Sequence, residues 1–129
     1  MTQKKKTLSI GIDPFLIDFS SAEFAAFPGL TAEKVKEGID NSVKNLTALG
    51  YDANHCWIDF GKTAVEVVKA RLTEREYDVV LIGAGIRNPA SNFLLFEKLI
   101  NIIHEFAPAA KICFNTNPGD TADAIKRWS

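Results

Sequence analysis

A glycine-rich turn followed by an arginine is the feature of this sequence best suited to bind a ligand. Gly83 and Gly85 have no Cβ atoms, so backbone N–H groups there are open to the close approach of an anion. Arg87 adds a fixed positive charge whose fork matches a phosphate or a carboxylate. The turn therefore has two interpretations, a bare tight turn and an anion site. Asn88 stands where a dinucleotide fingerprint needs its third glycine, which excludes a nicotinamide-dinucleotide site.

Polar residues follow the other strand-like segments as well. Asp13 follows the first segment, and a turn-rich stretch at 115–120 follows the last. In a parallel α/β sheet, ligands bind at the carboxyl ends of the strands, near the switch in strand order. The candidate ligand-binding residues are therefore Asp13, Gly83, Gly85, Arg87, Asn88, Asn115, Thr116 and Asn117. For 115–120 the alternative is structural, since Pro118 and Gly119 are typical of a turn before a helix.

Carboxylates and histidines give weaker signals of catalysis. Asp13 and Asp59 end two strand-like segments and could hold a cation such as Mg²⁺, while strand-end aspartates are also ordinary loop residues. His55 fits a partly exposed structural histidine on an edge strand better than a general base. His104 shares the polar face of a helix with other solvated side chains. No catalytic residue, cofactor or metal site is predicted.

Strand-like and helix-like segments alternate four times along the chain. The strands are expected at 7–12, 53–59, 78–83 and 111–115, and the helices at 31–49, 63–72, 93–106 and from 120 or 121 to 128. Thr31 and Gly50 are expected to cap the first helix, and Thr63 with Glu66 fits a capping box for the second. Short connections between such segments favour parallel strands with helices on both faces. The predicted fold is an α/β three-layer sandwich around a parallel sheet of four strands in the flavodoxin-like order 2-1-3-4.

Length, charge and cysteines limit the class of protein. The 129 residues suffice for one domain, expected at 7–129 behind a flexible basic tail at 1–6. A net charge of −1 argues against nucleic acid as a partner, and no apolar run approaches the roughly 20 residues of a membrane span. Asp13 and Pro14 end the first apolar run too early for a secretory signal. Cys56 and Cys113 are expected to be buried reduced thiols, which predicts a cytoplasmic protein.

A long apolar segment interrupts the regular alternation. Residues 14–30, which we call the flap, carry Phe15, Leu16, Ile17, Phe19, Phe24, Phe27 and Leu30. Exposing all these side chains to water is unfavourable, so the flap is expected to pack on its own domain, form a subunit contact or act as a lid. The helix at 93–106 is apolar almost all round, which also favours a covered second side. A homodimer is expected, through this helix, the edge of the fourth strand or the flap.

The order of elements and one local motif resemble the receiver domains of two-component signalling. Residues 76–82, EYDVVLI, are similar to the third receiver strand, Asp13 to one member of the receiver acidic pair, and Thr116 to the hydroxyl residue after the fourth strand. The resemblance implies a flavodoxin-like fold. Gly83 stands at the place of the phosphoacceptor aspartate, and the fifth strand with its lysine is missing, so receiver phosphoryl transfer is not carried over.

These observations lead to one function and two alternatives. We expect a non-catalytic cytoplasmic module that binds a small anionic ligand or a protein partner. The first alternative is a degenerate receiver that acts by protein contact. The second is a small metal-assisted hydrolase or transferase that uses Asp13 and Asp59.

Overall fold

Four parallel strands form the centre of the protein. The computed structural model describes residues 4–24 and 27–129. Within these residues, β1 (Lys6–Ile12), β2 (Asp52–Ile58), β3 (Val79–Ile82) and β4 (Lys111–Phe114) pair in the order β2-β1-β3-β4. The sheet confirms the predicted fold class and strand order, and it places β2 at an edge as expected. None of the helices in the described ranges is both long and apolar enough to cross a membrane.

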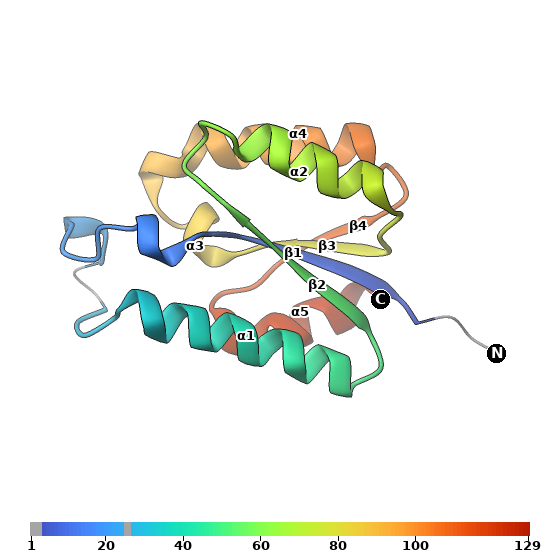
Figure 1. Cartoon of the computed structure of the whole chain (residues 1–129), viewed down its shortest axis with the longest axis horizontal. Helices are drawn as coiled ribbons and strands as arrows, with labels where there is room; N and C mark the ends of the chain where they lie inside the picture. Colours follow the sequence, from blue (N-terminus) through green and yellow to red (C-terminus); the bar gives the residue numbers. More distant parts are fainter. Residues whose placement is uncertain (1–3, 25–26) are drawn as a thin grey trace.

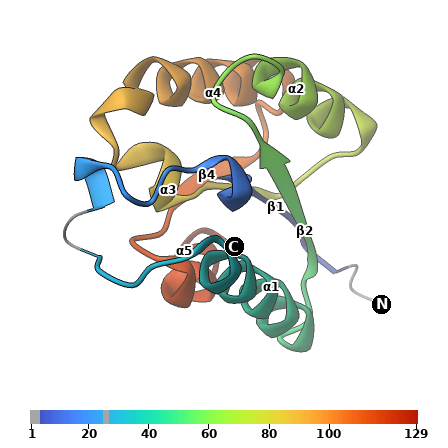
Figure 2. The ribbon, with the colours of Figure 1, turned by 60° about the vertical axis from the view of Figure 1, so that its left-hand side comes forward.

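Helices cover both faces of the sheet, as a chain of parallel strands requires. Figure 1 shows α2 (Ala64–Glu74) and α4 (Phe93–Phe106) on one face and α1 (Ala32–Ala48) and α5 (Thr121–Trp128) on the other. Figure 2 shows the same three layers from another side. The short helix α3 (Ala84–Arg87) directly follows β3 and lies at the carboxyl end of the sheet.

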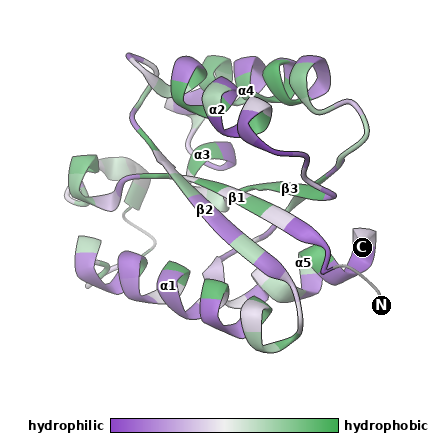
Figure 3. Ribbon diagram, turned by 45° about the vertical axis from the view of Figure 1, so that its right-hand side comes forward, coloured by the Kyte–Doolittle hydropathy of each residue, from purple (hydrophilic) through white to green (hydrophobic). Residues whose placement is uncertain are grey.

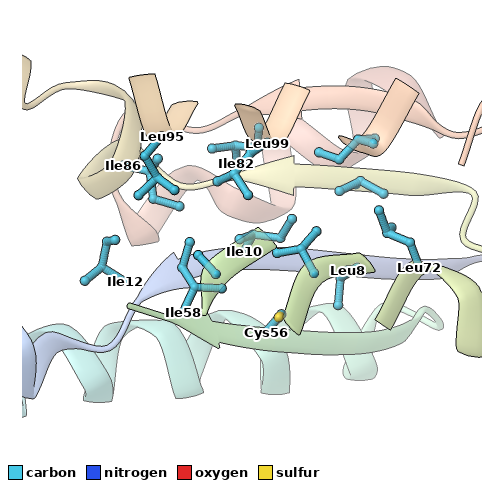
Figure 4. Close-up of a cluster of buried hydrophobic side chains, with 14 of the residues drawn as sticks. Leu8, Ile10, Ile12, Cys56, Ile58, Leu72, Ile82, Ile86, Leu95 and Leu99 are labelled. Atoms are coloured by element: carbon cyan, nitrogen blue, oxygen red, sulfur yellow. The ribbon is translucent and has the colours of Figure 1, made fainter. Parts of the chain in front are cut away.

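Two apolar cores, one on each face of the sheet, hold these layers together. The larger core joins β1, β2 and β3 to α2 and α4, and Figure 4 shows side chains from both layers meeting there, among them Leu8, Ile10, Ile82, Leu95 and Leu99. The smaller core contains Leu46, Val79, Leu81, Cys113, Ala122, Ala124 and Ile125. All four residues of β3 are buried, whereas the edge strand β2 carries polar residues, a contrast visible in Figure 3. Burial on both faces accounts for the unbroken apolar run of β3.

Local capping explains where two helices begin. Thr31 accepts a hydrogen bond from the N–H of Lys34 at the start of α1, and Gly50 adopts a φ of +99° after its end, so both predicted caps are confirmed. The predicted capping box at Thr63 is wrong. Thr63 makes no side-chain cap, and the carboxylate of Asp59 accepts from the N–H groups of Thr63 and Ala64 instead. An aspartate is an equally good acceptor for these unpaired donors.

Helix α4 is less apolar around its circumference than its sequence suggests. Leu95, Leu99 and Ile103 are buried, while a polar stripe faces solvent, made of Glu97, Lys98, Asn101, His104 and Glu105. Phe93 and Leu94, in the first turn, are 63% and 67% exposed. The apolar surface that lacks a cover is therefore confined to the beginning of the helix.

The flap forms two short turns that pack partly on the domain. Its described residues contain η1 (Pro14–Leu16) and η2 (Ala22–Phe24), with the rings of Phe19 and Phe24 5.1 Å apart. Ile17 packs against the larger core, whereas Phe15, Leu16 and Phe27 are more than half exposed. Residues 25–26 of the flap and 1–3 of the predicted tail lie outside the described residues. Lys6, assigned to the tail by sequence, is the first residue of β1.

Candidate functional site

The carboxyl ends of the strands bring several predicted site residues to one edge. The N–H of Asp13 donates to the carbonyl of Ile58 at the end of β2, and the N–H of Gly83 donates to the carbonyl of Ile10 in β1. The side chain of Asn115, directly after β4, accepts from the N–H of Ala84 at 2.8 Å. Asp13, Gly83 and Asn115 therefore share the edge that the parallel sheet predicted.

A cavity of about 80 Å³ lies beside this edge, between the sheet and α1. Its polar walls come from Ser9, Ser42, His55, Asn115 and Thr121, together with the backbone of Gly11, Gly83, Ala84 and Gly85. Its apolar walls are Ile10, Ile12, Ile17, Val35, Ile39, Leu81 and Pro118. The lining thus comes from β1, β2, β3, the flap, α1, α3, the loop after β4 and the start of α5, and it contains no Asp, Glu, Lys or Arg.

Ser9 and His55 form the most polar contact in the cavity wall. They are register partners on adjacent strands β1 and β2, so their side chains emerge side by side on the same face. Ser9 Oγ lies 2.6 Å from His55 Nδ1, and 3.4 Å from the carbonyl oxygen of Asn54. The short contact holds the imidazole ring in one orientation.

The surroundings of His55 favour its neutral form. Burial, with the nearby positive charge of Arg71 as a second cause, lowers the pKa of His55 to about 4, while Asp40 acts weakly in the opposite direction. The ring packs edge-on against Trp57, with centroids 4.1 Å apart. The absence of a side chain at Gly11 makes room for the imidazole ring, since a Cβ there would lie only 3.3 Å from His55 Cε1 and Nε2. His55 is therefore a neutral imidazole at neutral pH.

Asn115 holds the opposite wall of the cavity together. Its Oδ1 accepts from the N–H of Ala84, and its Nδ2 donates to Thr121 Oγ1 at 2.9 Å. These bonds join the start of α3, the end of β4 and the first turn of α5. Because the side chain is buried and both of its ends are engaged, Asn115 acts on the cavity mainly by positioning its neighbours.

Arg87 is turned away from the cavity. Its Nη2 donates to the carbonyl oxygen of Asn115 at 2.8 Å, and its guanidinium lies 5.8 Å from the centre of the Phe114 ring. Its Nε atom is buried and makes no hydrogen bond with the described residues. The guanidinium fastens α3 to the end of β4, so the positive charge expected for an anion site is already engaged within the fold.

The remaining candidates are divided between a second hollow and helix caps. Asn88 and Thr116 line a shallower hollow of about 320 Å³ beneath the flap, with Phe24, Phe27 and Pro89. Gly85 borders this hollow, the cavity and a third depression under Leu16, so it stands where all three meet.

Asp13, Asn117 and Asp59 have capping roles. Asp13 accepts from the N–H of Phe15, and Asn117 accepts from the N–H of Gly119. Asp59 accepts from the hydroxyl of Thr63 and from the N–H groups of Gly61 and Ala64, among others, and these hydrogen bonds lower the pKa of its carboxyl group. Among the residues that the structure describes, no three His, Cys, Asp or Glu side chains gather as a metal site would require.

Ser9, Ser42, His55 and Thr121 were missed as cavity residues by sequence reasoning. The signal for Ser9 was present in β1, where Thr7, Ser9 and Gly11 alternate with Leu8, Ile10 and Ile12. This alternation gives the central strand one face of large apolar side chains and one of small ones. Small side chains on a buried face leave space, and that space is the cavity.

Comparisons with known proteins do not assign the chain. No protein-family model matches the sequence, and the search of curated proteins found no match. Function is therefore argued from the geometry of the cavity and its surroundings.

The engagement of Arg87 leads to a stability prediction. Arg87→Ala is expected to lower the free energy of unfolding by about 1–2 kcal/mol, because it removes the hydrogen bond to Asn115 and the packing on Phe114. Urea denaturation measures the change. Lys98→Ala, at an exposed position of α4, is the control and should change stability by less than about 0.5 kcal/mol. An Arg87→Ala variant as stable as the wild type would show that the guanidinium is free for a ligand.

The low pKa of His55 leads to a prediction about pH. Unfolded His55 takes up a proton near pH 6.5 and folded His55 only near pH 4, so its contribution to stability is complete above pH 6.5 and lost as the pH falls toward 4. The expected loss is about 3 kcal/mol. Urea denaturation from pH 6.5 to 4 should therefore give a shallower decline for His55→Gln than for the wild type. His104→Gln, on the exposed stripe of α4, is the control, and equal declines for wild type and His55→Gln would contradict the prediction.

Proposed function

We propose that this domain is a binding module for a small molecule held in the cavity beside the carboxyl edge of β1 and β3. The observation that carries the proposal is the cavity itself, at the point where the strand order changes direction. In open parallel sheets, the connections from the two strands at this point run to opposite sides of the sheet. They leave a crevice at the carboxyl ends of the strands, and ligands bind there. A mostly apolar lining with a few convergent polar groups is also typical of small-molecule sites.

The arrangement of Ser9 supports binding rather than covalent chemistry. A serine paired with a histidine is a potential nucleophile, but acyl transfer also needs N–H donors aimed at the developing oxyanion. Ser9 lies in the interior of β1, which pairs in parallel ladders with β2 and β3 on its two sides. Its surrounding N–H groups are thus committed to the sheet. The alternative of a metal-assisted hydrolase has little support, since Asp13 and Asp59 serve as caps.

An anion at the loop from Gly83 to Arg87 has less support than an uncharged ligand in the cavity. Arg87 donates to a backbone carbonyl, and the N–H of Ala84 is already bonded to Asn115. A ligand there would have to displace both contacts.

Protein contact is a second candidate function, and we propose a homodimer as its form. Six large apolar side chains are between 49% and 67% exposed in the flap, the loop after β2 and the first turn of α4: Phe15, Leu16, Phe27, Phe60, Phe93 and Leu94. Figure 1 shows these segments at one end of the molecule. We call these six residues the apolar end. Exposed apolar surface of this kind favours association, and a degenerate receiver would use the same surface.

A cytoplasmic location is part of the proposal. Cys56 belongs to the core under α2 and α4, and Cys113 belongs to the core on the other face of the sheet. Both are free thiols, and burial raises the pKa of each. Two thiols held apart in this way suit a reducing compartment.

The cavity predicts ligand binding that a plug at Gly85 removes. A Cβ at Gly85 would meet no atom within 4 Å, so Gly85→Leu begins its added side chain in open space beside the cavity that Gly85 lines. We expect small uncharged molecules from a fragment set to shift the backbone amide resonances of Gly11 and Gly83 in the wild type but not in Gly85→Leu. Inorganic phosphate and acetate, added separately, test the anion. Ala48→Leu, at the exposed end of α1, is the matched control and should bind as the wild type does. If no member of the set shifts these resonances, the proposed function is wrong.

The apolar end predicts self-association. Light scattering after gel filtration should give twice the chain mass of 14.2 kDa for the wild type and the single mass for the double variant Phe93→Ser with Leu94→Ser. Leu49→Ser is the control, because Leu49 is also exposed but follows α1 at the other end of the molecule. A monomeric wild type at high micromolar concentration would contradict the proposed homodimer.

A further inference from the structure

One ring nitrogen of His55, a residue of the cavity lining, has no hydrogen-bond partner among the described residues. Its Nε2 atom is buried and makes no hydrogen bond with any described residue, while its Nδ1 is held by Ser9. A Cβ built at Gly11 would lie 3.3 Å from Nε2 and 3.9 Å from Ile39 Cδ1, and Gly11, Ile39 and His55 all line the cavity. A buried polar atom in a cavity wall is the natural contact for a ligand, because leaving it unpaired is unfavourable.

We propose that the ligand of this cavity is a small uncharged alcohol whose hydroxyl group donates a hydrogen bond to His55 Nε2. The inference rests on the proposed function of the cavity and adds the chemical class of the ligand. His55 is then the residue that determines specificity.

The hydrogen-bond pattern around Ser9 makes Nε2 an acceptor. If His55 Nδ1 carries the hydrogen, it donates to Ser9 Oγ, and the Ser9 hydroxyl in turn donates to the carbonyl of Asn54. Every hydrogen in this chain has an acceptor, and Nε2, on a residue that lines the cavity, is left with a free lone pair. With the opposite tautomer, the contact between Ser9 and Asn54 would have no hydrogen to support it.

The charge of the lining selects an uncharged ligand. The cavity walls contain no Asp, Glu, Lys or Arg, and His55 is neutral. An ion entering the cavity would lose its hydration without gaining a counter-charge, which is strongly unfavourable. Arg71, the nearest positive charge acting on His55, donates to the carbonyl of His55 itself.

The size of the cavity and the hydroxyl of Thr121 in its wall favour an alcohol over an amide or an amine. A water molecule needs about 10–15 Å³ of such space, so 80 Å³ accommodates roughly six non-hydrogen atoms. Thr121 Oγ1 accepts from Asn115, which leaves its own hydrogen to donate to a ligand oxygen. A hydroxyl group both donates and accepts, and the carbon body of a small alcohol fits against Val35, Ile39 and Pro118.

Two probes of equal size test the hydrogen bond to His55. Cyclopentanol and tetrahydropyran each have six non-hydrogen atoms and an oxygen acceptor, but only cyclopentanol has a donor. Titrated into the full chain and followed by the amide resonances of Gly11 and Gly83, cyclopentanol should bind about five to ten times more tightly. In His55→Phe, which keeps a ring but removes Nε2, the two probes should bind equally. In Ala48→Leu, the control at the exposed end of α1, cyclopentanol should keep its advantage.

The outcomes separate this inference from the proposed function. If both probes bind the wild type equally, or tetrahydropyran binds more tightly, Nε2 does not accept from the ligand and the inference is wrong, while ligand binding in the cavity stands. If neither probe binds, the alcohol is excluded, and the wider fragment set decides the proposed function. Should His55→Phe fail to fold, the imidazole nitrogen spectrum of the wild type decides instead, because a hydrogen found on Nε2 overturns the inference.

Discussion

The central strand β1 has to be buried on both faces, and its two faces carry side chains of different size. Leu8, Ile10 and Ile12 fill the space toward α2 and α4 with large side chains. Thr7, Ser9 and Gly11 present small side chains toward α1 and α5. The first face forms a close-packed core, and the second leaves room for the His55 ring and for the cavity beside it.

The cavity lies where the fold has rigid walls rather than loops alone. Asn115 joins the start of α3 to the first turn of α5, and Arg87 fastens α3 to the end of β4. Ser9 holds the imidazole of His55 from the neighbouring strand. Polar groups held by packed elements keep their positions before a ligand arrives, which lowers the cost of ordering them on binding. The flap contributes Ile17 to the same walls, so it belongs to the cavity as well as to the apolar end.

The two proposed functions use adjacent parts of the same end of the molecule. The cavity contacts the flap at Ile17 and α3 at Gly85, and the apolar end begins with the neighbouring residues Phe15 and Leu16. The hollow beneath the flap is lined by Phe24 and Phe27 from the flap and by Pro89 from the segment before α4. Association at the apolar end would therefore cover the segments that border the cavity mouth.

The sequence by itself determined the architecture, because hydrophobic periodicity and short connections are local signals. The four strands, their order, the caps at Thr31 and Gly50 and the burial of both cysteines were all predicted from them. Only the tertiary structure decided the site. Ser9 and His55 are 46 residues apart and meet because β1 and β2 pair in one particular register. Arg87 has a side chain suited to binding an anion, but its guanidinium donates to the carbonyl of Asn115, 28 residues away in the sequence. Residue type tells what chemistry a side chain can do, whereas its partners depend on long-range packing that no local pattern encodes.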